Sequence, residues 1–191
     1  MKKVIFDIET KNTFDDAQSN DPADLDVSVV CLYDSDSNQY LSFLEDQFDQ
    51  MWPYFEQADL IVTYNGKHFD LPCLQPHAPL DLSAIKHVDM FEKMQQVTGK
   101  KLPLNGIAQS TLGIAKSGHG LDAIAWWNSG EIQKIIDYCI QDVKVTEAVY
   151  NHALQNGELK YEDRKTKKEV VVKLDTSDWE TIEKPAQGGL F

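Results

Sequence analysis

The stretch VIFDIETK, residues 4–11, places two carboxylates in an apolar run that is typical of a buried β-strand. Successive side chains of a strand point to opposite faces, so Asp7 and Glu9 share one face. Two hard oxygen ligands on one face suit a divalent cation, which would offset their mutual repulsion and their desolvation. The alternative is a strand end that emerges into water. Other parts of the sequence are needed to distinguish a metal site from a solvated strand end.

Four further strands are expected around this one. Residues 27–33 and 39–44 are β-rich runs separated by DSDSN, which is typical of a hairpin turn. After an amphipathic helical pattern, the short apolar run at 59–65 indicates a parallel strand buried on both faces, and residues 85–91 predict another. The expected fold class is therefore α/β. It contains a mixed five-stranded sheet, with an antiparallel meander of strands 1–3 followed by parallel strands 4–5, flanked by helices.

The last third of the chain predicts three different kinds of segment. Residues 131–153 repeat apolar side chains at helical spacing and predict a long helix. Residues 155–175 alternate in two arms around a charged turn and predict an appended β-hairpin. Residues 176–191 contain a proline, two glycines and no periodicity, which indicates a flexible tail. The main domain is therefore expected to comprise residues 1–154.

Composition limits the class of protein. The 191 residues are 42% hydrophobic and carry a formal charge of -13, which suits one acidic globular domain. No apolar run is long enough for a membrane span, and the first residues lack the apolar segment of a secretory signal. We therefore expect a cytoplasmic protein with no membrane partner. The charge argues against a broad electrostatic grip on nucleic acid, but it permits an enzyme that holds a few nucleotides through bound cations.

Three more side chains, at the ends of predicted elements, could reach the opening strand. Asp70 follows the buried strand in TYNGKHFD. Tyr138 and Asp142 lie four residues apart on the long helix, and so on one face of it. Buried carboxylates without positive partners are costly. Divalent cations would supply the missing positive charge.

The acids fall into three blocks in order: FDIET with Asp7 and Glu9, NGKHFD with Asp70, and YCIQD with Tyr138 and Asp142. In this combination the chain resembles the DEDD 3′–5′ exonucleases of the ribonuclease H-like fold, across about residues 1–154. Position 138, four residues before the last aspartate, holds tyrosine, and no histidine stands five before it. The chain is therefore similar to the tyrosine subclass (DEDDy), as are the proofreading domains of family B DNA polymerases.

The resemblance implies two divalent cations, Mg²⁺ or Mn²⁺, which in such sites lie about 3.5 to 4 Å apart and serve an in-line phosphoryl displacement. Asp7 would bridge both ions. Glu9 and Asp142 would bind the ion on the nucleophile side, whereas Asp70 would act on the second ion through water. Tyr138 would orient the attacking water, because a phenol with an ordinary pKa near 10 is a poor base at neutral pH. The alternative for Tyr138 is simple packing on the helix.

Candidate substrate contacts surround these blocks. Thr10 follows the acids closely enough to touch a terminal nucleotide. Asn65 would either hydrogen-bond the substrate backbone or cap a turn with the following glycine. His68 and Phe69 would flank the terminal base, although a phenylalanine is more commonly a core residue. Asp89 is either a second acid behind the site or a strand-end residue. The expected phosphate contacts are four lysines: Lys67, Lys100, Lys101 and Lys116. The alternative for any single one of them is a solvated surface lysine.

The final five residues, QGGLF, raise a separate question, because Leu190 and Phe191 place apolar side chains at the end of an expected tail. The pattern resembles the bacterial sliding-clamp-binding pentapeptide, in which Gln187 would anchor one edge and the Leu-Phe pair would fill a hydrophobic pocket. The two central glycines depart from the commoner residues of that motif. The alternative is that both apolar side chains fold back onto their own domain. A clamp partner would favour DNA as the substrate.

Three functions are consistent with these features. The first is a two-metal-dependent 3′–5′ exonuclease that removes nucleoside monophosphates from single-stranded or frayed 3′ ends of DNA, in replication or repair. The second keeps the chemistry but trims RNA. The third is a non-catalytic, clamp-docking nucleic-acid-binding adaptor that retains the fold, which the presence of all four acids disfavours.

Overall fold

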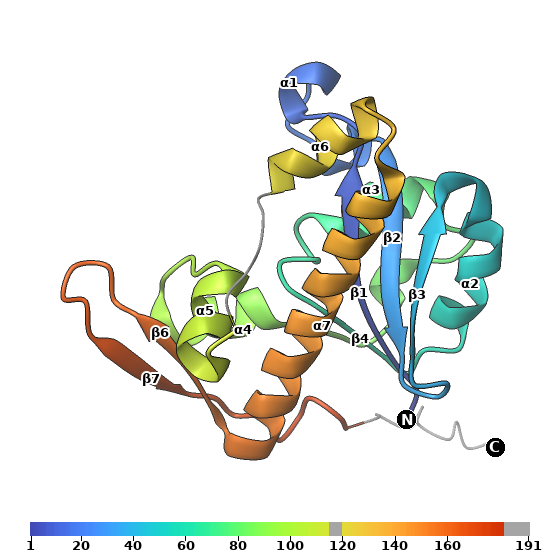
Figure 1. Ribbon diagram of the computed structural model, residues 1–191. Helices are drawn as coiled ribbons and strands as arrows, with labels where there is room; N and C mark the ends of the chain where they lie inside the picture. Colours follow the sequence, from blue (N-terminus) through green and yellow to red (C-terminus); the bar gives the residue numbers. More distant parts are fainter. Residues whose placement is uncertain (115–119, 182–191) are drawn as a thin grey trace, which may run out of the picture.

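The computed structural model describes residues 1–114 and 120–181, and a five-stranded sheet in the order β3-β2-β1-β4-β5 lies at its centre (Figure 1). The strands of this sheet are β1 (Lys3–Thr10), β2 (Val27–Asp34), β3 (Gln39–Leu44), β4 (Leu60–Thr63) and β5 (His87–Asp89). β1 pairs with β2 and β2 with β3 in antiparallel fashion, whereas β4 is parallel to both β1 and β5. The predicted mixed α/β sheet, with its meander and its two parallel strands, is confirmed.

β1 occupies the middle of the sheet because both of its faces are apolar. Val4, Phe6 and Ile8 belong to the hydrophobic core on one side, whereas Ile5 belongs to the core on the other side. The core that contains Ile5 also contains the buried face of the long C-terminal helix. Because side chains alternate along a strand, the residues at 7 and 9 share the face of Ile5 and point toward that helix.

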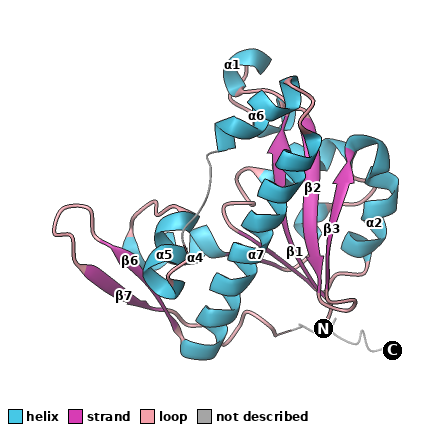
Figure 2. Ribbon diagram, viewed as in Figure 1, coloured by secondary structure: helices cyan, strands magenta, loops and turns pink. Residues whose placement is uncertain are grey.

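The C-terminal helix crosses the sheet face formed by β1 and β2 (Figure 2). The helices are α1 (Phe14–Ala17), α2 (Phe48–Glu56), α3 (Asp70–Leu74), α4 (Met90–Thr98), α5 (Leu104–Leu112), α6 (Gly120–Asn128) and α7 (Ile132–Asn156). α7 buries an apolar stripe that includes Ile135, Cys139 and Val143. It ends at Gly157, whose φ of 64° is the left-handed conformation that glycine adopts at helix ends. The helix predicted over 131–153 is therefore present and continues for three more residues.

A separate two-stranded sheet follows α7 and packs on α5 instead of joining the main sheet (Figure 2). Its strands, β6 (Glu158–Glu162) and β7 (Glu169–Lys173), form an antiparallel hairpin. The hydroxyl of Thr111 on α5 accepts a hydrogen bond from the Lys160 N–H, 2.9 Å, and donates one to the Lys160 carbonyl, 3.2 Å. These two bonds hold one edge of the hairpin against the body of the protein. The appended hairpin was predicted.

Residues 176–181 return to the surface of α7, which the sequence did not predict. The side chain of Trp179 is 1% exposed and stacks on Tyr150 of α7, with ring centroids 5.8 Å apart and an interplanar angle of 17°. The prediction of a flexible tail from residue 176 is therefore wrong for 176–181. The physical reason is that one large aromatic side chain can anchor a segment that has no periodicity of its own.

The candidate clamp-binding residues, Gln187, Leu190 and Phe191, lie outside the described residues. Within the described ranges, none of the helices is both long and apolar enough to cross a membrane.

Candidate metal centre

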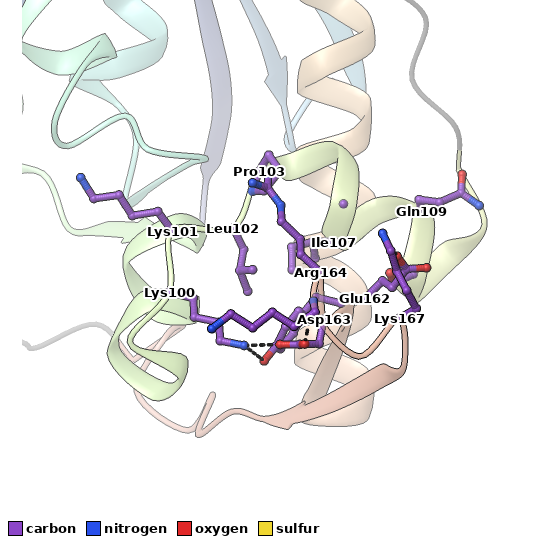
Figure 3. Close-up of a pocket in the computed structure, with 14 residues that line it drawn as sticks. Lys100, Lys101, Leu102, Pro103, Ile107, Gln109, Glu162, Asp163, Arg164 and Lys167 are labelled. Atoms are coloured by element: carbon purple, nitrogen blue, oxygen red, sulfur yellow. Dashed lines mark hydrogen bonds and ion pairs between the residues drawn. The ribbon is translucent and has the colours of Figure 1, made fainter.

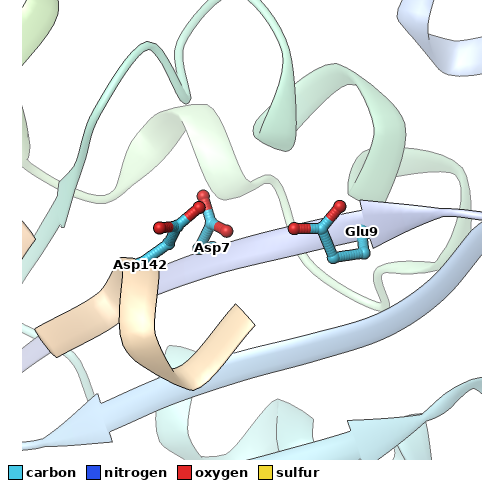
Figure 4. Close-up of side chains that lie close together, drawn as sticks. All are labelled: Asp7, Glu9 and Asp142. Carbon is cyan, nitrogen blue, oxygen red and sulfur yellow. The ribbon is translucent and has the colours of Figure 1, made fainter. Parts of the chain in front are cut away.

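Three carboxylates from two elements meet beside the middle of the sheet (Figure 4). Asp7 and Glu9 extend from β1, and Asp142 extends from α7. Each contributes an oxygen atom, and these atoms all lie within 4.8 Å of one another. Glu9 and Asp142 are 9% and 7% exposed, and Asp7 is half-buried. The structure therefore brings together three of the four predicted acids, and their like charges favour a bound cation.

Two buried thiols fit α7 against the sheet at this point. Cys139 donates a hydrogen bond from its thiol to the carbonyl oxygen of Asp7, 3.3 Å. Cys31, the residue that pairs with Asp7 across the β1–β2 ladder, places its thiol 3.8 Å from the carbonyl oxygen of Ile136. A cysteine is a small, apolar side chain that lets a helix approach a sheet closely. Cys139 lies one turn before Asp142, so this contact brings Asp142 over β1.

Asp70, the fourth predicted acid, begins α3 and lies against β1. Its Oδ1 accepts a hydrogen bond from the backbone N–H of Ile8, 3.2 Å, between the two acids of the strand. Burial raises the pKa of the Asp70 carboxyl well above its usual range, and the charges of Asp89 and Asp142 raise it further. Asp70 does not belong to the group of three, but the charge of Asp142 acts on it. A nearby cation would favour its ionised form.

The loop between β4 and α3 is organised by Asp89 at the end of β5. Its two carboxylate oxygens accept hydrogen bonds from the backbone N–H groups of Asn65, 2.8 Å, and Lys67, 3.0 Å. The same carboxylate accepts from Phe91 N–H, 3.0 Å, and caps α4. Asp89 is thus a strand-end residue that fixes the loop leading to Asp70, and its charge also acts on the Asp70 carboxyl.

A chain of hydrogen bonds keeps the same loop close to the sheet. The Thr63 hydroxyl accepts from the Gly66 N–H, 3.1 Å, and lies 2.8 Å from Nε2 of His87. Either neutral tautomer of His87 can make this bond, because the hydroxyl can donate to Nε2 or accept from it. A Cβ atom at position 66 would lie 2.4 Å from Oγ1 of Thr63, so this approach requires glycine. The glycine of the NGKHFD block therefore has a packing role.

Acidification is expected to destabilise the protein through His87. Burial lowers the pKa of His87 to about 4, against an ordinary value near 6.5. Between these values the unfolded imidazole binds more protons than the folded one, so the contribution of His87 to stability is lost as the pH falls from 6.5 toward 4, by at most about 3 kcal/mol. The raised pKa of Asp70 acts in the opposite direction, so the His87 contribution is measured as a difference between variants. In urea unfolding at a series of pH values, His87→Gln should lose less stability than wild type over this interval. His68→Gln, which changes an exposed histidine, should follow wild type. Parallel profiles for all three proteins would contradict a buried neutral His87.

Tyr138 lies one turn before Asp142 and is 7% exposed. Its ring packs edge-on against Trp126 of α6, with centroids 5.9 Å apart. The neighbouring Trp127 lies under the ammonium of Lys11, 5.2 Å from its ring centre, where β1 has ended. These two tryptophans were not singled out from the sequence, although their adjacency could have drawn attention. α6 thus covers one side of the candidate site.

The four predicted substrate contacts lie in different environments. Thr10 is 9% exposed and donates its hydroxyl proton to the carbonyl of Asn12, 3.0 Å. Asn65 adopts a left-handed backbone conformation with a φ of 73°, and its backbone N–H donates to the carboxylate of Asp89. His68 is exposed. Phe69 is half-buried and packs against Phe14, with the two ring centroids 6.2 Å apart. The structure therefore leaves the imidazole of His68 accessible and gives Phe69 a packing role.

The predicted phosphate-binding lysines are mostly paired. Lys67 forms an ion pair with Glu92, 2.6 Å, and Lys100 forms one with Asp163, 2.6 Å. Lys101 is exposed and takes part in none of the ion pairs among the residues that the structure describes. Lys116 falls in the segment 115–119, outside the described residues.

The chemical type of the ligand atoms limits which metal ion the site could hold. All three clustered ligands are carboxylates, and oxygen ligands are those that Mg²⁺ and Mn²⁺ prefer, whereas zinc sites usually include imidazole or thiolate. Asp7, Glu9 and Asp142 therefore fit the divalent cations expected from the sequence. Nothing in the donor set distinguishes Mg²⁺ from Mn²⁺.

Comparisons with known proteins give one consistent result. A family model described as RNase_H superfamily matches residues 4–154. A DNA-directed DNA polymerase of Escherichia phage T7 is 23% identical, over 65% of this chain and 24% of that protein. The structure of a family B DNA polymerase from the archaeon Pyrobaculum calidifontis matches with a TM-score of 0.64 and 20% identity, over 81% of this chain and 24% of that one. This chain thus spans about a quarter of these relatives.

Proposed function

The chain belongs to the RNase H superfamily, and on this premise we propose that it is a metal-dependent 3′–5′ exonuclease that removes nucleoside monophosphates from single-stranded or frayed 3′ ends of DNA. The observation that carries the proposal is the convergence of oxygen atoms of Asp7, Glu9 and Asp142 within 4.8 Å. The preference for DNA is supported by the relatives, both of which are named DNA polymerases. Replication or repair is the process in which such an activity would serve.

The acids have the primary role in this proposal. Asp7, Glu9 and Asp142 would hold divalent cations, and Asp70 would add a fourth carboxylate beside them. Bound cations would polarise the scissile phosphodiester and assist deprotonation of the attacking water. The hydroxyl of Tyr138 would orient that water, as in the tyrosine subclass of exonucleases.

The remaining predicted contacts complete the proposal. Thr10, whose hydroxyl is donated to the Asn12 carbonyl, would touch the terminal nucleotide through its backbone. Asn65, whose backbone N–H is donated to Asp89, would hydrogen-bond the substrate backbone through its side chain. His68, which is exposed, would flank the terminal base. Docking on a bacterial sliding clamp through Gln187, Leu190 and Phe191 stays a prediction from the sequence.

The direct test is degradation of 5′-labelled single-stranded DNA and of the matched RNA by wild-type protein with Mg²⁺, Mn²⁺ or EDTA. We expect ladders that shorten from the 3′ end with either metal, no shortening in EDTA, and faster degradation of the DNA. Faster degradation of the RNA would favour an exoribonuclease. A lack of degradation under all conditions would contradict a nuclease and leave the non-catalytic adaptor.

A further inference from the structure

A cavity of about 690 Å³ lies between the loop that precedes α5 and the turn of the β6–β7 hairpin (Figure 3). None of the clustered acids lines it. One wall of the cavity, the hairpin turn, follows the 4–154 segment that the family model matches. Seven of the side chains that line the cavity carry charge, five positive and two negative: Lys100, Lys101, Arg164, Lys165, Lys167, Glu162 and Asp163.

The positive charge of this cavity is only partly neutralised. The two acids pair with Lys100, 2.6 Å, and with Lys167, 3.4 Å. Lys101, Arg164 and Lys165 take part in no ion pair among the described residues. Arg164 is the single arginine of a chain whose formal charge is -13. Since the Debye length at physiological salt is about 8 Å, these local cations, and not the distant acids, set the potential that a ligand meets here.

Asp163 holds the hairpin turn in a defined shape. Its Oδ1 accepts hydrogen bonds from the N–H groups of Lys165, 3.1 Å, and Thr166, 3.0 Å. Its Oδ2 forms the ion pair with Lys100, which ties the turn to the opposite wall. Arg164, directly after it in the chain, extends across the cavity toward Pro103 (Figure 3). The cations are therefore carried on an ordered turn.

A second hollow of about 520 Å³ adjoins this cavity. Both hollows are lined by Lys101 and Arg164, and the second one extends to Asn65, in the loop that leads to Asp70. Two aromatic side chains, Tyr64 and Phe91, also line it, with ring centroids 6.0 Å apart. Cations beside aromatic rings are the combination that binds single-stranded nucleic acid, through phosphates and stacked bases.

We propose that these two hollows form one groove, which binds the single strand on the 5′ side of the nucleotide that is removed. Lys101, Arg164 and Lys165 would contact phosphates, and Tyr64 and Phe91 would stack on bases. The inference rests on the proposed function for the direction of the strand. It also explains how an acidic protein retains a nucleic acid strand: its positive charge is concentrated along one groove.

The test neutralises two groove cations in the 191-residue chain and compares the result with neutralisation of two lysines outside the groove. Arg164→Gln/Lys165→Gln removes two charges from the groove, and Lys168→Gln/Lys173→Gln removes two exposed charges from the same hairpin outside its lining. Both pairs are made in an Asp7→Asn background, so that a fluorescein-labelled oligothymidylate of about 20 nucleotides, longer than typical single-strand sites, survives in Mg²⁺. Fluorescence anisotropy then gives affinity as a function of salt.

We expect the groove variant to bind about 10-fold more weakly, with a log–log salt slope flatter by roughly 1.4, since each phosphate contact on a single strand contributes roughly 0.7. The control variant should match its parent. Equal affinities and slopes for both variants would overturn the groove, as would a parent that binds no oligothymidylate. Arg164→Lys/Lys165→Arg, which keeps both charges, should restore binding if the loss is electrostatic and not a folding defect.

Kinetics separate this inference from the proposed function. In the otherwise wild-type chain, the ratio of kcat/KM on the long strand to that on the p-nitrophenyl ester of thymidine 5′-monophosphate should fall in the groove variant, because the ester has no upstream phosphates. An unchanged ratio would overturn the groove and leave the exonuclease intact. If the chain hydrolyses neither substrate but the groove variant loses affinity, the result supports the nucleic-acid-binding groove and contradicts the exonuclease activity.

Discussion

Asp7→Asn is expected to slow metal-dependent DNA degradation by about 1,000-fold or more, because a bound cation contributes several kcal/mol to the transition state of phosphodiester hydrolysis. Asparagine keeps the shape of the side chain but replaces one ligand oxygen with a nitrogen and removes the charge. Asp7 belongs to the group of three whose oxygens lie within 4.8 Å. The measurement is the rate of shortening of a 5′-labelled strand in Mg²⁺, and Asp7→Ala should lose at least as much.

Asp137→Asn is the matched control for this substitution. This substitution makes the same atomic exchange on α7, directly before Tyr138. The side chain of Asp137 is exposed and accepts a hydrogen bond of 2.8 Å from the side-chain amide of Gln133. Thermal unfolding in EDTA should show that Asp7→Asn is at least as stable as wild type, because it removes one of several like charges. A folded Asp7→Asn protein with wild-type nuclease activity would show that the acid cluster is not the catalytic centre.

The acids could be selected from the sequence because each one lies in a strong local pattern. The period of two along residues 4–11 put Asp7 and Glu9 on one face, and helical spacing put Tyr138 and Asp142 on another. Local periodicity does not say which faces meet. The order of the three blocks, with the family resemblance, supplied that information, and in the structure the faces of β1 and α7 do meet.

Features that depend on contacts between distant segments were not predictable in the same way. The sequence left two roles open for Asp89, and its hydrogen bonds to the loop at Asn65 exist only because β5 lies beside β4. The packing of Trp126 on Tyr138 needs α6 and α7 to be placed together. The lining of the 690 Å³ cavity combines Lys101 with residues of a hairpin about sixty positions away in the chain. The local sequence around each of these residues shows no pattern that indicates the contact.

The C-terminal segment gives the clearest example of a tertiary contact that overrides a local pattern. Trp179 is 1% exposed and stacks on Tyr150, and the ammonium of Lys93 lies 5.8 Å from its ring centre. The next residue, Glu180, accepts a hydrogen bond from the hydroxyl of Tyr150, 2.9 Å, and pairs with Lys3 of β1, 2.7 Å. Residues 176–181 therefore connect α7 with the first strand of the sheet.

Trp179→Ala is accordingly expected to lower the free energy of unfolding by about 3 to 5 kcal/mol, the usual cost of emptying a buried tryptophan site. Urea unfolding followed by far-ultraviolet circular dichroism measures it. Trp179→Phe should cost clearly less, because it keeps a ring to stack on Tyr150 and because no acceptor among the described residues meets the indole N–H. Equal urea midpoints for Trp179→Ala and wild type would mean that this segment does not stabilise the fold.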